Sequence, residues 1–421
     1  MTTSTSMQPS TAAVARTHLN TRHGTYELGK VIGQGASAKV RLATHTTSHH
    51  VCVIKSIKRP RLETSDCPIQ PADVDKLWKK ELFNIREASI SMLLDHPNIS
   101  RMFSAVLGEH HIYALFEHLP GQDLVDVIRN CGYIKPKRAR HIFRQVLSAI
   151  DFAHRNSVIH RDIKLENIRY NAATGLATVL DFGFATFYDK TGNRLIQNNC
   201  GSPSYASPEI FANSFYQGPE IDIWSLGVCL YGMSCGTLPF AGQSFAELSA
   251  SVKHSEISFP DHTSSDLIDL ISRMLQRDPD QRITMDDILE HPWVSPNIIS
   301  PRHNLNSQNT IPPQLITAVL GKSPQEEAEI LQKVMFSERS PQRNVGVSRN
   351  PINKLSATNP RKLSPIIAPR PVSDHHLKTK LLTRVQSDNE TLVPKQTWLS
   401  RLASKVFGAR SSNNSHSSHR T

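Results

Sequence analysis

The residues best suited to chemistry stand in two short stretches near the middle of the chain. Residues 158–167 read Val-Ile-His-Arg-Asp-Ile-Lys-Leu-Glu-Asn, and in the second stretch Asp181 is followed by Phe and Gly. Two carboxylates and an amide, on Asp162, Asp181 and Asn167, can hold divalent cations and orient a hydroxyl group for attack on a phosphate. These residues therefore predict phosphoryl transfer, in which positioning and charge neutralisation do most of the work.

A turn of glycines and small residues lies further upstream, between two β-rich runs that begin at Tyr26. Residues 33–40 read Gly-Gln-Gly-Ala-Ser-Ala-Lys-Val, and backbone N–H groups in such a turn can approach a phosphate without obstruction by side chains. By itself this pattern favours a plain tight hairpin. One strand later, however, the apolar run 51–54 ends in Lys55, either as a solvated strand end or as a partner for phosphate. Its place between the turn and residues 158–167 favours the second interpretation.

A helix must supply an acidic partner for Lys55. The polar stretch Arg59–Asp75 contains proline and predicts a surface loop, and a helical pattern follows over Lys76–Leu94. Glu87 lies on the register that best fits the end of this helix, and Glu81 is the weaker candidate. Most helical glutamates only face solvent, so the register of the helix decides between them.

Several residues later in the chain are predicted to have structural roles. An apolar stripe that begins near Lys137 predicts a helix leading into residues 158–167. Asp222 is expected to brace the backbone of those residues. Arg282 is expected to form a buried ion pair with Glu209.

The composition excludes some classes of protein, and the distribution of charged residues shows where the net positive charge lies. The six cysteines form no Cys-x-x-Cys pair, which argues against a zinc site or a disulfide framework and suits a reducing compartment. No apolar run is long enough for a membrane span. Residues 297–421 hold 18 Lys and Arg against 7 Asp and Glu, a surplus of 11 that equals the net charge of the whole chain. The basic character therefore belongs to the tail and predicts a regulatory or localising role there.

Taken together, residues 26–294 resemble a complete eukaryotic-type protein kinase domain. The resemblance implies an α+β, bilobal fold, with a small β-rich N-lobe that contains one main helix, a larger mostly helical C-lobe, and disordered flanks. Five further motifs are similar to those of the calcium/calmodulin-dependent and AMP-activated kinase group, and within it to fungal polarity kinases related to the microtubule-affinity-regulating kinases. They are Arg86-Glu-Ala-Ser, His96-Pro-Asn-Ile, Cys200-Gly-Ser-Pro-Ser-Tyr, Gly218-Pro-Glu-Ile-Asp and His291-Pro-Trp.

The same resemblance implies a role for each motif residue in a Ser/Thr kinase that uses ATP and Mg²⁺. Asp162 orients the substrate hydroxyl, and Lys164 neutralises the γ-phosphate and indicates Ser/Thr specificity. Asn167 and Asp181 hold Mg²⁺, while Lys55, braced by Glu87, contacts the α- and β-phosphates. The remaining ATP contacts are Ile32, Val40 and Val53 around the adenine, the turn residues Gly33, Gln34, Gly35, Ala36, Ser37, Ala38 and Lys39 over the phosphates, and the backbone of Glu117 and Leu119 at the adenine edge.

The chain departs from the family pattern at three positions. Ala38 replaces the third glycine of the turn, and Ser207 replaces the alanine of Ala-Pro-Glu; both changes are small. Asn198 stands where this group commonly has a threonine whose phosphate pairs with the arginine before the catalytic aspartate, here Arg161. We expect no phosphate at this position, with Arg161 either held by another hydrogen bond or loose.

Substrate preference is expected to be mildly basophilic. Asp123 and Glu166 stand where this group places acids that receive arginines upstream of the target residue. Gly232 replaces a further acid of strongly basophilic relatives, which predicts modest selectivity. We expect protein substrates, no nucleic acid and a monomer, located in the cytoplasm with the cell cortex as a second site.

The flanks are predicted to differ from the domain. Residues 1–25 are Ser/Thr-rich and are expected to be disordered, and residues 295–421 are expected to form a basic, largely disordered regulatory tail. Short helices are predicted at 311–339 and 395–410, the second with basic residues around one apolar face. That face suits a membrane-surface, autoinhibitory or partner-binding helix, and a solvated tail is an equal alternative.

Two other functions compete with an active protein kinase. A pseudokinase scaffold would use the same fold without catalysis, but it has no chemical need for the intact set of motif residues. A phosphotransferase for small molecules would not need the Gly218-Pro-Glu-Ile-Asp element of a peptide-substrate platform.

Overall fold

A computed structural model describes residues 17–35, 38–60, 71–295 and 311–336. Among these residues, those up to Ala241 and those from Leu248 onward belong to one compact unit, and residues 242–247 fall in a second unit. Every element below lies in the first unit, except the start of α6 (Phe245–His254). No helix among the described residues is long and apolar enough to cross a membrane.

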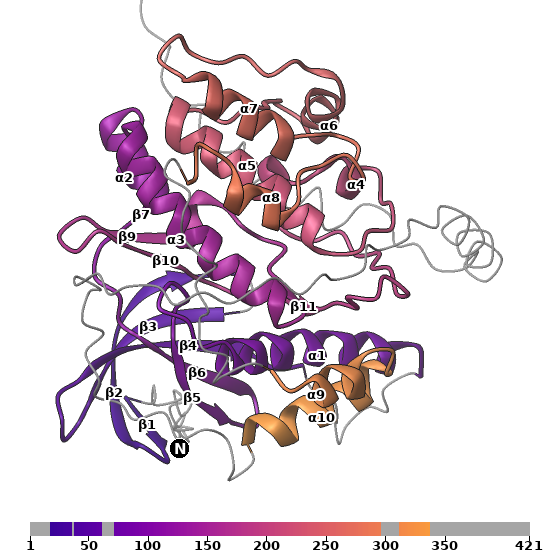
Figure 1. The fold of residues 1–421 in the computed structure, drawn as a ribbon. Coiled ribbons are helices and arrows are strands. Elements are labelled where there is room, and N and C mark those ends of the chain that lie inside the picture. Colours follow the sequence, from indigo (N-terminus) through magenta and orange to yellow (C-terminus); the bar gives the residue numbers. More distant parts are fainter. Residues whose placement is uncertain (1–16, 36–37, 61–70, 296–310, 337–421) are drawn as a thin grey trace, which may run out of the picture. The chain divides into compact units, whose positions relative to one another are not determined.

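A six-stranded antiparallel sheet forms the N-terminal lobe, in the order β1-β2-β3-β4-β6-β5 (Figure 1). In β4 the buried Cys52 and Ile54 alternate with the half-buried Val53 and Lys55, so the last two share one face of the strand. Two residues predicted to contact the nucleotide are thus placed together by strand periodicity. The strands are β1 (His18–Thr21), β2 (Gly24–Gln34), β3 (Ala38–His45), β4 (Val51–Lys58), β5 (Met102–Leu107) and β6 (His111–Glu117).

One helix, α1 (Pro71–Leu93), completes this lobe. Proline suits the first turn of a helix, where its missing N–H group has no intrahelical partner. Leu82, Ile85 and Met92 are buried at spacings close to the helical repeat, so one stripe of α1 faces the core. Glu81 and Glu87 of the same helix are also buried, and each therefore needs a partner.

The C-terminal lobe is mainly helical. Its helix α5 is buried along almost its whole length, as expected for a helix that is apolar all round. Three short strands, β7 (Gln122–Asp123), β9 (Ile168–Asn171) and β10 (Leu176–Val179), form one small sheet, and β8 (Val158–Ile159) pairs with β11 (Thr186–Phe187). The helices are α2 (Leu124–Cys131), α3 (Pro136–Arg155), α4 (Pro208–Phe211), α5 (Pro219–Cys235), α6, α7 (Ser265–Met274) and α8 (Met285–Glu290), with 3₁₀ turns η1 (Leu165–Asn167) and η2 (Pro203–Tyr205).

The predicted α+β, bilobal fold is therefore confirmed for the described residues, but two boundaries are wrong. Residues 18–25 were expected to be disordered, and yet β1 pairs with β2, for example Leu19 with Tyr26. Leu19 and Tyr26 are both buried, so an apolar contact fixes this extra edge strand. The helix also begins at Pro71 and includes residues 71–75, which were expected to be part of a surface loop.

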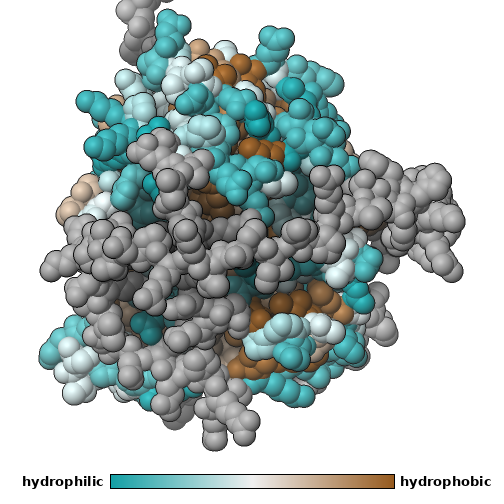
Figure 2. Space-filling view, viewed as in Figure 1, coloured by the Kyte–Doolittle hydropathy of each residue, from teal (hydrophilic) through white to brown (hydrophobic). Residues whose placement is uncertain are grey.

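Two helices follow the C-terminal lobe: α9 (Pro313–Val319) and α10 (Pro324–Phe336). They lie inside the range 311–339 where short helices are predicted, and α10 packs along α1 (Figure 1). Val319, Leu331 and Met335 are buried and belong to the same apolar core as α1 and the C-terminal lobe. Apolar residues also gather at the surface over these helices (Figure 2). The helix predicted at 395–410 lies outside the described residues.

Candidate active site

The loop that carries Asp162 is held by a buried carboxylate. Asp222, which is fully buried on α5, accepts hydrogen bonds from the backbone N–H groups of His160 and Arg161, both at 2.8 Å. The Nε2–H group of His154 donates a third hydrogen bond to Asp222 at 2.8 Å. Burial would raise the pKa of Asp222, but its hydrogen bonds with His154 and His160 lower it overall. The predicted bracing role of Asp222 is confirmed, and it lets Arg161 adopt a left-handed backbone with φ of 66°.

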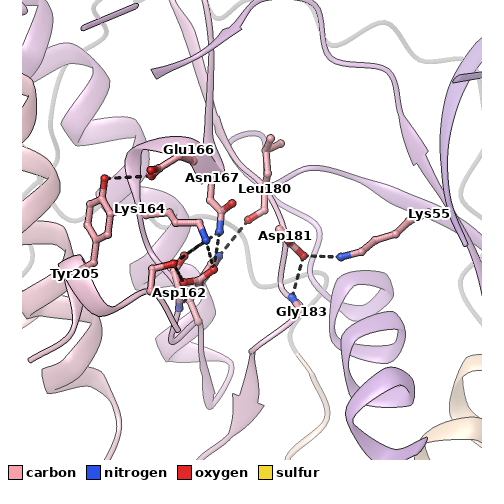
Figure 3. Close-up of polar contacts among 11 residues, drawn as sticks. Lys55, Asp162, Lys164, Glu166, Asn167, Leu180, Asp181, Gly183 and Tyr205 are labelled. Atoms are coloured by element: carbon pink, nitrogen blue, oxygen red, sulfur yellow. Dashed lines mark hydrogen bonds and ion pairs between the residues drawn. The ribbon is translucent and has the colours of Figure 1, made fainter. Parts of the chain in front are cut away.

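Three side chains hold the carboxylate of Asp162 (Figure 3). Lys164 donates to its Oδ2 at 2.7 Å, and Ser202 donates to its Oδ1 at 2.8 Å. The amide of Asn167 donates to the backbone carbonyl of Asp162 at 2.9 Å and to Oδ2 at 3.2 Å. Lys164 also donates to Ser202 at 2.8 Å, so the cluster is closed on itself. The carboxylate of Asp162 is thereby fixed in direction and its charge is balanced.

A second cluster joins the two lobes at Lys55. Its ammonium group forms an ion pair with Glu87 of α1. A second ion pair joins it to Asp181 at 2.7 Å (Figure 3). The structure thus places Glu87 against Lys55, whereas Glu81 pairs with Arg59 at 2.7 Å. Burial would lower the pKa of Lys55, but the two carboxylates outweigh it and raise this pKa above its usual range. Lys55 is therefore a firmly charged group at the junction of the lobes.

Backbone geometry around Asp181 directs its carboxylate. Asp181 has a φ of 55°, and its Oδ1 accepts a bond from the N–H group of Gly183 at 3.2 Å. A side chain at Gly183 would bring a Cβ atom to 3.0 Å from that same oxygen. Burial would raise the pKa of Asp181, but the Lys55 ammonium group outweighs burial and lowers it. The next residue, Phe182, is buried with its ring centroid 4.7 Å from that of His160.

Two side-chain oxygens are available to bind a divalent cation. Asp181 uses Oδ1 for both of its contacts above, and its side chain is 47% exposed. Asn167 is anchored through its Nδ2, so its Oδ1 is the atom that remains for a cation. The described residues contain no cluster of three His, Cys, Asp or Glu with metal-binding geometry. These two oxygen donors fit Mg²⁺, which typically takes one or two protein side chains together with substrate phosphates and waters.

The predicted nucleotide residues lie on β2, β3, β4 and the end of β6. Gly33 pairs with Val40 across the β2–β3 hairpin, and the N–H group of Gly35 donates to the carbonyl of Ala38 at 2.9 Å. Val40 pairs in turn with Lys55. The remaining hairpin residues of the prediction are the exposed Ile32, Gln34 and Lys39. Ala36 and Ser37 lie outside the described residues.

The predicted adenine edge follows β6. The backbone N–H group of Glu117 donates to the carbonyl of Arg101 at 3.0 Å, and its side chain accepts from the N–H group of Arg101 at 2.8 Å. Leu119 lies in the connector between β6 and β7. These contacts anchor the strand end at which the connector begins.

Ser202 is the site residue that the sequence prediction omitted. Its hydroxyl contacts both Asp162 and Lys164, although 40 residues separate it from Asp162. The motif Cys200-Gly-Ser-Pro contained the signal, because a hydroxyl at a fixed place in a motif of this group is available for such a contact.

Two buried arginines have different partners. Arg282 forms the predicted ion pair with Glu209, with nitrogen–oxygen distances of 2.7 and 3.1 Å, and this prediction is confirmed. Arg161 instead donates through Nε to the carbonyl of Phe184 at 2.7 Å. Arg161 is therefore held by another hydrogen bond, which is the first of the two expectations above, and it is not loose.

The two acids predicted to receive a substrate arginine already have partners. Asp123 pairs with Arg169 at 3.1 Å, and Glu166 accepts from the hydroxyl of Tyr205 at 3.1 Å. Burial raises the pKa of Asp123. A substrate arginine would have to share these carboxylates with their present partners.

The fold and this site define a class of protein, and comparison with known sequences agrees. Residues 26–294 match the protein kinase domain family, and the chain belongs to that family. It is similar to "Protein kinase kin1" of Schizosaccharomyces pombe, with 36% identity over 328 residues, which cover 75% of this chain and 36% of that protein. It is also similar to "SNF1-related protein kinase catalytic subunit alpha KIN12" of Arabidopsis thaliana, with 32% identity, covering 77% of this chain and 59% of that protein.

A third relative extends the group beyond fungi and plants. "Probable serine/threonine-protein kinase MARK-C" of Dictyostelium discoideum is 37% identical over 275 residues, which cover 65% of this chain and 33% of that protein. The chain thus spans between 33% and 59% of the length of these relatives. The predicted resemblance to the AMP-activated and microtubule-affinity-regulating group is confirmed.

Proposed function

We propose that this chain is a Ser/Thr protein kinase that transfers the γ-phosphate of ATP to a hydroxyl group of a protein substrate. The observation that carries the proposal is a complete set of charged groups for handling phosphate. Lys55 pairs with Asp181 on one side of the site, and Lys164 pairs with Asp162 on the other. The three similar proteins are themselves named as protein kinases, which supports the same activity.

Asp162 is the group that receives the proton of the substrate hydroxyl. Ser202 and Lys164 each hold one of its carboxylate oxygens, which fixes the direction from which a hydroxyl can approach. The ammonium group of Lys164 lies between Asp162 and Ser202, where it can offset the negative charge of the transferred phosphoryl group. Because these hydrogen bonds hold Asp162 and Lys164 in place, little reorganisation is needed during transfer.

Lys55 positions the nucleotide phosphates, and Glu87 positions Lys55. Since the pKa of Lys55 is raised, its ammonium group stays charged at physiological pH. Mg²⁺ held by Asn167 and Asp181 would neutralise part of the phosphate charge. Val53 shares the face of β4 with Lys55, which supports a role for it beside the adenine.

The same residues argue against a pseudokinase scaffold. A scaffold needs the packed core and the braced loop, but it does not need Lys164 within hydrogen-bonding distance of Asp162 or Lys55 paired with two carboxylates. The contacts specific to phosphate chemistry are all formed.

The test uses radiolabelled ATP and a Ser peptide with an arginine three residues before the serine. We expect the wild type to phosphorylate the peptide and Asp162→Asn to lower kcat by about 10³-fold, the usual scale for loss of a general base. Equal background signal in both proteins would support the scaffold instead. Thermal unfolding of the two proteins serves as the control for folding.

We further propose a signalling role in the cytoplasm or at the cell cortex. The support is the resemblance to fungal polarity kinases and the concentration of basic charge in residues 297–421. Microscopy of the tagged chain, with and without residues 297–421, tests this proposal, and unchanged localisation after truncation would contradict the role of the tail.

A further inference from the structure

Arg161 precedes the catalytic aspartate and is tied to two parts of the C-terminal lobe. Its backbone N–H group donates to Asp222, and its Nε donates to the carbonyl of Phe184, directly after Asp181-Phe-Gly. It is only 7% exposed, so its guanidinium group needs partners within the protein. Its charge also acts on the buried hydroxyl group of Tyr216, whose pKa it lowers against the larger effect of burial.

Tyr216 holds the segment that precedes Ser202. Its hydroxyl donates to the backbone carbonyl of Asn198 at 3.0 Å. Burial raises the pKa of Tyr216 to about 12, so the hydroxyl keeps the proton that this bond requires.

The backbone of Tyr216 holds the same segment. Its N–H and carbonyl groups exchange hydrogen bonds with Ile196 at 3.0 and 2.8 Å, which forms an isolated antiparallel bridge. The ring is buried in a small apolar cluster with Ile159, Tyr188 and Ile221. Packing therefore fixes the position of the hydroxyl, and residues 196–198 are attached to it by backbone and side chain.

We propose that Tyr216 is a positioning residue that holds the backbone of Asn198 and so keeps Ser202 against Asp162 without a phosphate. The proposal rests on the proposed kinase function. Asn198 has no hydroxyl group to phosphorylate, and the side-chain hydrogen bond of Arg161 runs to the neutral carbonyl oxygen of Phe184. Only four positions separate Asn198 from Ser202, so a shift of this segment would move the hydroxyl that holds Asp162.

The test compares Tyr216→Phe with the matched control Tyr188→Phe in the full chain. Both changes delete one buried tyrosine hydroxyl; that of Tyr188 donates to the carbonyl of His154 at 3.0 Å. We expect Tyr216→Phe to lower kcat about fivefold, the usual scale for one hydrogen bond between neutral groups, with KM for ATP within about twofold of the wild type. Tyr188→Phe should keep kcat within about twofold of the wild type, even if its thermal unfolding temperature falls as much as that of Tyr216→Phe. Equal kcat for the two variants would overturn the proposal.

Phosphatase treatment of the wild-type protein gives a second test that does not depend on a variant. We expect the treated enzyme to keep its activity. Activity that is present before treatment and lost after it would overturn the role of Tyr216 but leave the proposed function intact. A wild-type protein that is inactive in both states, with a signal equal to that of Asp162→Asn, would instead overturn the proposed function and this inference with it.

Discussion

The two lobes hold their reactive groups in different ways. In the C-terminal lobe the buried carboxylate of Asp222 fixes the backbone of the loop, and neighbouring side chains then hold Asp162. In the N-terminal lobe Lys55 depends on Glu87, and Glu87 is only as well placed as the helix α1 that carries it. A group fixed through its own backbone is rigidly preorganised, whereas a group on a movable helix can be adjusted.

Three ion pairs set the position of α1, and one comes from outside the kinase domain. Glu81 pairs with Arg59 after β4, Glu87 pairs with Lys55, and Arg86 forms two bonds to Glu327 of α10. Residues 81, 86 and 87 point in well-separated directions around a helix with 3.6 residues per turn. The placement of Glu87 therefore depends on contacts around the whole circumference of α1, including one with the C-terminal helices.

The largest expected effect is on the stability of the C-terminal lobe. Asp222→Asn should lower the free energy of unfolding by about 3–5 kcal/mol, because buried donors lose a charged acceptor. Folding lowers the pKa of Asp222, so its contribution is present above the unfolded pKa of about 3.9 and is lost as pH falls through the lower folded value. The difference between wild type and variant in chemical denaturation should therefore shrink only in strong acid.

The matched control is Asp269→Asn, which alters a half-exposed carboxylate that also pairs with a histidine, His291. This change should lower the free energy of unfolding by less than about 1 kcal/mol, as for other exposed ion pairs. Equal losses for the two variants would contradict the idea that Asp222 is the central brace.

The next effect concerns catalysis in the N-terminal lobe. Glu87→Gln should lower kcat/KM by about hundredfold, the scale for loss of one preorganised electrostatic contact, with little change in unfolding temperature. Glu81→Gln should lower the unfolding temperature and lower kcat/KM only about threefold to tenfold, since Glu81 pairs with Arg59 away from the nucleotide and acts on Glu87 only through the position of α1. Steady-state kinetics and thermal unfolding of both variants measure this contrast. Similar kinetics for the two would mean that the position of α1, and not the Lys55–Glu87 pair, controls activity.

A smaller effect is expected at the contact between α1 and α10. Glu327→Gln should increase amide hydrogen exchange in α10 and lower kcat/KM about threefold to tenfold, because Arg86 loses a buried partner and Glu87 is held less firmly. Glu326→Gln alters the exposed neighbour, which contacts Lys322 and Ser323, and should change neither measurement. A Glu327→Gln variant with faster kinetics would show that α10 restrains the kinase and does not support it.

The smallest effect is expected for substrate choice. Asp123→Asn should raise KM about threefold for a peptide with an upstream arginine, while kcat and the KM of an arginine-free peptide stay unchanged. The effect is small because Asp123 is half-exposed and already shares its charge with Arg169. A peptide array with a preference for acidic residues or for proline would contradict the basophilic interpretation.

Local sequence was sufficient for the residues whose partners are set by a motif or a periodic element. The apolar run 51–54 predicts the strand that carries Lys55, and the register of the following helix favours Glu87 over Glu81 as its partner, in agreement with the ion pairs of the structure. Such predictions succeed because strand and helix periods fix side-chain direction within a few residues. The start of the folded region is not predicted correctly. Strand β1 is too short for a periodic pattern, and it forms by pairing with β2.

The motifs are enough to predict the chemistry, because Asp162, Lys164, Asn167 and Asp181 have residue types that suit phosphate transfer. The distant groups that support them become visible only in the folded chain. Ser202 contacts Asp162, Tyr216 contacts Asn198, and Glu327 contacts Arg86 across 241 residues. The physical reason is that a hydrogen bond or ion pair requires contact within about 3 Å. Separation along the chain carries no information about such contact until the core has brought the segments together.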